Sequence, residues 1–126
     1  MTIHRPFGLP LICLALAALT ACSSRPEVDP KSVPALSAMA RTLLDGSRSD
    51  TVYHPKWPAG IRELLHPVQI EQIRIHPEGV YIVTSRSFVE EDGLFVPRDP
   101  ATFQPDSGDP SYTLVALDVF IYHVAG

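Results

Sequence analysis

The feature that most constrains this chain is its N-terminal segment, which closes with Leu19-Thr20-Ala21-Cys22. A positively charged start, Met1 to Arg5, is followed by an apolar run from Leu9 to Leu19 and then by small residues. This order has the three-part layout of a secretory signal, which is removed from the mature protein. The apolar run is nearer a dozen residues than the eighteen or more that a membrane-spanning helix requires. We therefore expect residues 1–21 to be a signal peptide and the folded domain to lie beyond it.

Leu19-Thr20-Ala21-Cys22 resembles the lipobox of bacterial lipoprotein precursors, over about the first 22 residues and no further. The resemblance implies a diacylglycerol on the Cys22 thiol, cleavage just before Cys22, and acylation of the new amine, with palmitate as a typical chain. Two or three acyl chains anchor a protein stably, at about 0.8 kcal/mol per buried methylene. In Gram-negative members an Asp after the cysteine favours the inner membrane, and Ser23 stands there instead. The resemblance thus implies a cell-envelope protein, on the outer membrane facing the periplasm in a Gram-negative organism; the alternative is an ordinary secretory signal with a chance cysteine.

The predicted mature chain is the 126 residues less the 21 of the signal, which suits one small domain with a modest core. Loss of Arg5 leaves nine basic residues against fourteen acidic ones, a formal charge of −5. This balance and the lack of a basic run argue against a nucleic-acid partner. Since Cys13 lies in the signal and Cys22 carries the lipid, no thiol remains for a disulfide, a thiolate metal site or a nucleophile.

Residues 22–34 contain three prolines, Pro26, Pro30 and Pro34, and few apolar side chains. Prolines at this spacing favour a semi-rigid spacer of about 3.1 Å per residue. We expect residues 22–34 to be a lipidated tether that holds the domain up to about 35 Å from the membrane; a disordered tail is the alternative. The single domain then covers residues 35–126.

Two helices are predicted at the start of this domain. Ala35 to Leu44 has one apolar face and a proline suited to its first turn. Ala59 to Leu65 is a shorter candidate that follows Trp57-Pro58. We interpret Trp57, the only tryptophan, as a staple over the edge of the core rather than a platform for a ligand.

From Val68 onward the hydrophobic pattern becomes that of short strands separated by turns. Phe88-Val89 is expected to pair back through the turn at 90–93, and Pro97 to Pro110 to form a long loop. The predicted fold class is α+β, with one or two N-terminal helices packed on a small antiparallel meander sheet of four or five strands.

One face of such a sheet must bury against the helices, and the other is half-solvated or a binding surface. Strand alternation places Tyr81, Phe95 and Phe120 on the same face. The candidate binding surface combines aromatic residues with an acidic hairpin tip and the 97–110 loop; its residues are Tyr81, Phe95, Tyr112, Phe120, Tyr122, Glu90, Glu91 and Asp92. The alternative is that at least half of these aromatic side chains are core.

Signatures of catalysis and of metal binding are missing from the sequence. No two histidines have the i, i+4 spacing of a helical metal site, and the acidic cluster lacks the alternating ligands of a calcium loop. Neither a Gly-x-Ser-x-Gly elbow nor a phosphate-binding glycine loop is present. We predict no catalytic residue, no metal and no cofactor, and hence a protein that is not an enzyme.

The sequence therefore predicts a lipid-anchored envelope protein that acts by non-covalent binding or a structural role. Its predicted partners are the membrane, through Cys22, and an unidentified envelope protein. The alternative is a periplasmic inhibitor or immunity-type lipoprotein that neutralises a hydrolase or toxin, with Glu90, Glu91 and Asp92 meeting a basic active-site rim. A small envelope hydrolase is a third, weaker hypothesis.

Overall fold

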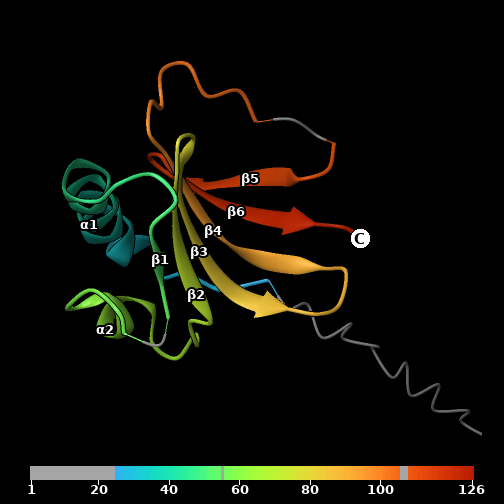
Figure 1. The fold of residues 1–126 in the computed structure, drawn as a ribbon, viewed down its shortest axis with the longest axis horizontal. Coiled ribbons are helices and arrows are strands. Elements are labelled where there is room, and N and C mark those ends of the chain that lie inside the picture. Colours follow the sequence, from blue (N-terminus) through green and yellow to red (C-terminus); the bar gives the residue numbers. More distant parts are fainter. Residues whose placement is uncertain (1–24, 55, 106–107) are drawn as a thin grey trace, which may run out of the picture.

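The computed structural model describes residues 25–54, 56–105 and 108–126 (Figure 1). The predicted signal peptide and the lipidation residue Cys22 lie outside the described residues. The elements, in chain order, are η1 Pro30–Ser32, α1 Val33–Gly46, β1 Val52–Tyr53, α2 Ile61–Leu65, β2 Gln72–His76, β3 Gly79–Arg86, β4 Glu91–Pro97, β5 Ser111–Ala116 and β6 Val119–Val124.

The six strands form one antiparallel sheet in the order β1-β2-β3-β4-β6-β5. Each of the first three strands pairs with the next in the chain, but the last hairpin is turned so that β6, and not β5, lies beside β4. The α+β prediction is confirmed, with six strands instead of four or five. The additional strand, β1, has only two residues, which is too short for an alternating pattern to be visible in the sequence.

Helix α1 forms where its apolar face predicts it, and begins two residues earlier than expected. Pro34 lies in its first turn, where a missing N–H costs nothing. Leu36, Ala40, Leu43 and Leu44 are buried along one side. The helix contacts α2, β3 and β6, and Figure 1 shows both helices on the same side of the sheet.

The two faces of the sheet are buried by different kinds of side chain. On the helix side, an aliphatic cluster joins α1 and α2 to the strands, and its strand members are Ile73, Ile75, Val80, Ile82, Leu94, Val96 and Val119. On the other side, Tyr81 pairs with Phe95 and Phe95 with Phe120, so these three rings share a face as predicted. Alternation along the strands separates the two clusters.

The segment before α1 is packed on the domain and is not a free tether. Pro26 is buried, Val28 packs against the aliphatic cluster, and Val33 is fully buried. The Asp29 carboxylate accepts a hydrogen bond from the backbone N–H of Lys31 at 3.0 Å, which fixes the first turn of η1. The predicted tether 22–34 is therefore wrong over its second half, because its few apolar side chains find places in the core.

Candidate binding site around Trp57

The aromatic residues expected to form a binding surface are largely core. Phe95 is 0% exposed, Tyr122 1% and Phe120 9%. Phe103, from the 97–110 loop, covers them: its ring centroid lies 5.1 Å from that of Phe95 and 5.1 Å from that of Phe120. The loop thus closes this face. Phe95, Phe120 and Tyr122 do not form a surface, and the alternative that at least half of the aromatic side chains are core is confirmed.

Tyr81 and Tyr112 lie half-buried at the rim of the aromatic cluster, with their hydroxyl oxygens 2.9 Å apart. The Tyr81 hydroxyl also donates to the Glu78 carboxylate at 2.8 Å. Burial raises the pKa of both phenols, and the hydrogen bonds raise that of Tyr81 further. Both hydroxyls are therefore protonated at neutral pH and act as hydrogen-bonding groups rather than as bases.

Glu91 belongs to an internal polar network instead of a solvated hairpin tip. Its carboxylate accepts hydrogen bonds from the Arg74 guanidinium and, at 2.7 Å, from the Tyr122 hydroxyl. Arg86 Nε lies 3.6 Å from the other carboxylate oxygen. Burial and the bond to Glu91 raise the pKa of Tyr122. The charge of Glu91 is thus matched by two guanidinium groups on β2 and β3.

Asp92 is also inside the fold, 2% exposed, with Oδ1 2.7 Å from Nδ1 of His123 on β6. Of the three acidic residues, all of them described by the structure, only Glu90 is exposed. The turn lies three residues earlier than predicted, at 87–90 instead of 90–93, and β4 begins at Glu91. The predicted acidic hairpin tip is therefore wrong for Glu91 and Asp92, which leaves Glu90 at the turn.

Several hollows in the described part of the chain lie around Trp57. Three of them, with volumes of about 440, 450 and 540 Å³, all have this indole in their walls. Each volume lies in the range of ligand-binding pockets. Their other lining residues come from the α2 region, from the segment before β2 and from the end of β3: His54, Lys56, Pro58, Ala59, Gly60, Arg62, Glu63, His66, Pro67, Val68, Gln69, Ile70, Glu71, Gln72 and Arg86.

A tight bend in the chain presents Trp57 at this place. Gly60 precedes α2 with φ of 86°, a left-handed conformation that favours glycine. The N–H of Ile61 donates to the Pro58 carbonyl, and that of Leu64 to the Gly60 carbonyl. Ile61 and Leu65 bury the other side of α2 in the aliphatic cluster. The residues that line the hollows are thereby fixed to the core.

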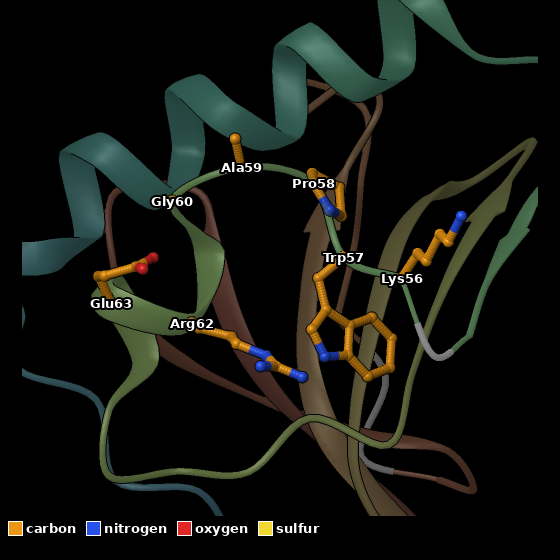
Figure 2. A pocket seen from close by; sticks show the side chains of 7 residues that line it. All are labelled: Lys56, Trp57, Pro58, Ala59, Gly60, Arg62 and Glu63. Carbon is orange, nitrogen blue, oxygen red and sulfur yellow. The ribbon is translucent and has the colours of Figure 1, made fainter.

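Trp57 has two roles in the geometry. It is half-buried and packs against the aliphatic cluster, so the staple interpretation is confirmed. Its indole also lines the hollows, and Figure 2 shows the Arg62 side chain extending toward it while Glu63 points away. The ring of His54 approaches the indole edge-on, with centroids 6.1 Å apart. A flat ring beside an exposed guanidinium suits a ligand with an apolar part and a carboxylate.

The charges around the hollows differ from those of the whole protein. Three cationic side chains, Lys56, Arg62 and Arg86, line the hollows together with two carboxylates, Glu63 and Glu71, and Arg86 is also paired with Glu91. The lining is therefore close to neutral, whereas the predicted mature chain carries a formal charge of −5, and the exposed side chains of Lys56 and Arg62 supply cationic groups there. Such a contrast favours an anionic ligand.

Sequence reasoning did not assemble this site, because its walls come from segments that meet only after folding. The available signal was a single tryptophan followed by proline, which by itself favours a staple over the edge of the core rather than a platform for a ligand. Among the described residues, no group of three or more His, Cys, Asp or Glu side chains is arranged to hold a metal ion. In 25–54, 56–105 and 108–126, no helix has the length and apolar character of a membrane span.

The chain matches no family model, no curated protein and no solved structure.

Proposed function

We propose that this protein is a lipid-anchored envelope protein that binds an extended, anionic segment of another envelope protein in the hollows around Trp57. Its mode of action is non-covalent binding rather than catalysis. The lipobox at residues 19–22 supports the anchor, and the junction of three hollows at one indole supports the binding role.

The form of the site favours a peptide segment over a compact metabolite. All three hollows have Trp57 in their walls. The 450 Å³ hollow also shares Arg62 with the 440 Å³ hollow and Ile70 with the 540 Å³ hollow. An occupant that fills more than one of them has to be extended. An apolar side chain would stack on the indole while a neighbouring carboxylate meets Arg62, whose planar group binds carboxylates in a two-pronged manner.

Site-specific photo-crosslinking in the native envelope tests this proposal. The photoreactive residue replaces His66, which is exposed and lines the 450 Å³ hollow. This position leaves Trp57 and Arg62, the two groups proposed to bind the partner, unchanged. The matched control position is Leu114, which is 56% exposed on β5 at the other edge of the sheet. The proposal predicts one dominant protein adduct at position 66 and none at 114.

A second variant shows whether the adduct depends on the site chemistry. Arg62→Glu reverses the charge of an exposed side chain, so we expect the fold to be retained and the adduct at position 66 to be lost. Adducts that are the same at positions 66 and 114, or that persist in Arg62→Glu, would contradict the proposed binding role.

A further inference from the structure

The turn between β3 and β4 presents two apolar side chains to solvent. Phe88 is 103% exposed and Val89 56%. They occupy the centre of a closed turn, in which the Ser87 N–H donates to the Glu90 carbonyl at 2.9 Å and the Glu90 N–H to Ser87 Oγ at 3.2 Å. Turn centres usually hold glycine, asparagine or aspartate, so a phenylalanine held outward at a fixed tip is unusual.

The chain end that would carry the lipid emerges at this end of the sheet. Figure 1 shows the first described residues (blue) running along the sheet from α1 toward the end of β3, where the β3–β4 turn and the C-terminus also lie. The contact of Val89 with Gly126 confirms that the turn and the C-terminus adjoin. The β5–β6 turn, with Leu117, lies at the opposite end, since β6 runs from it toward Val124, which pairs with Glu91.

The length of chain between the lipid and the domain is short. Pro26 is already buried, and Cys22 is four residues before it, which gives a reach of at most about 14 Å. A domain held this closely must turn one end toward the bilayer, and the end that carries Phe88 is the one at which the chain emerges.

We propose that the Phe88-Val89 turn inserts into the bilayer interface beside the lipid on Cys22 and orients the domain on the membrane. The inference rests on the lipid anchor of the proposed function. The Phe88 ring, which is 103% exposed, has no internal contact to lose when it enters the interface, and with Val89 it adds buried apolar area to that of the acyl chains. The same contact fixes which end of the sheet faces away from the membrane.

The test uses full-length protein, processed in a bacterial host and reconstituted into vesicles of phosphatidylethanolamine and phosphatidylglycerol, with or without bromine on the acyl chains. In the variant Trp57→Phe with Phe88→Trp, the sole tryptophan reports on the β3–β4 turn. In the matched control, Trp57→Phe with Leu117→Trp, it reports on a side chain that is 68% exposed at the far end of the sheet. Brominated chains quench only a tryptophan that reaches them.

The expected result is that position 88 loses most of its emission in brominated vesicles and position 117 loses none. Intact mass, measured on the same samples, shows whether the lipid is attached. If brominated chains reduce the emission equally at the two positions in lipidated protein, the inference is overturned and the anchor stays intact. A mass without lipid would overturn the anchor, and the inference with it.

Discussion

Arg41 on α1 and Asp118 in the β5–β6 turn, 77 residues apart in the chain, form a hydrogen-bonded ion pair. Ser37 Oγ, one helical turn earlier, donates to the same carboxylate at 2.6 Å. Arg41 also donates to the Arg98 carbonyl at 2.7 Å. These bonds fasten the helix to the far end of the sheet, opposite the turn that we propose to meet the membrane.

Asp118→Asn should reveal that the Arg41–Asp118 pair makes a pH-dependent contribution to the free energy of unfolding. Burial alone would raise the pKa of Asp118, but the hydrogen bonds from Ser37 and Arg41 outweigh burial and lower it from 3.8. The stabilisation is therefore complete above about pH 4, where the unfolded carboxyl is also ionised, and disappears as pH falls through the lower folded pKa. We expect the variant to lower the free energy of unfolding by about 1.5 kcal/mol at neutral pH.

Urea denaturation between pH 7 and pH 2 measures this effect. Asp45→Asn, which removes an exposed carboxylate from the same helix, is the matched control and should change little. A difference between wild type and Asp118→Asn that stays constant down to pH 2 would contradict the assignment.

Truncation to alanine should lower the stability of the protein at Phe103 but not at Phe88. Phe103 lies over Phe95, Phe120 and Tyr112 with centroid distances of 5.1 Å to each, and it is half-buried. We expect Phe103→Ala to lower the free energy of unfolding by about 2 kcal/mol and to expose the 97–110 loop to proteolysis. Phe88→Ala removes a fully exposed ring and should leave both stability and proteolysis in solution unchanged. Equal effects of the two variants would contradict the closed aromatic face.

Glu91→Ala should be much more destabilising than Glu90→Ala. Loss of the Glu91 carboxylate leaves the Arg74 guanidinium and the Tyr122 hydroxyl without their shared acceptor, at a cost of about 3 kcal/mol. Glu90 is exposed at the adjacent turn and controls for the loss of one negative charge. Thermal unfolding of the two variants gives the comparison, and similar midpoints would show that Glu91 is a solvated tip residue after all.

Glycines 46 and 93 offer a further matched pair. A Cβ on Gly93 would collide with the Ile82 carbonyl and lie 2.8 Å from Cε1 of Tyr122, so Gly93→Ala should unfold the protein at markedly lower denaturant concentration. Gly46 is the last residue of α1 and has nothing within 4 Å of the added atom. Gly46→Ala should therefore stabilise the protein, by up to about 1 kcal/mol.

Local patterns in the sequence were enough for the helix and most strands. The apolar spacing of Leu36, Ala40, Leu43 and Leu44 predicts α1, and the alternation around Tyr81 and Phe120 predicts the two faces of the sheet. Both patterns depend only on periodicity within one element, so no knowledge of distant partners is needed.

The features that were missed depend on contacts between distant residues. In the sequence, Glu91 and Asp92 both look like turn residues. Their partners are far away in the chain: Arg74, 17 residues earlier, bonds to Glu91, and His123, 31 residues later, lies beside Asp92. Likewise, nothing local indicates that Phe103 covers the aromatic face, or that Trp57 stands where three hollows meet. The candidate site was therefore not predictable from the sequence. The lipobox is a linear motif that can be read without the fold, and the lipid on Cys22 stays a prediction.

The most direct test of the central claim, that this domain works at a membrane surface through a lipid on Cys22, is metabolic labelling with radioactive palmitate. The wild-type chain and Cys13→Ala, which removes the other cysteine, should both incorporate label into a membrane-bound product, and Cys22→Ala should incorporate none. Label that persists in Cys22→Ala, or that is missing from the wild type, would contradict the account.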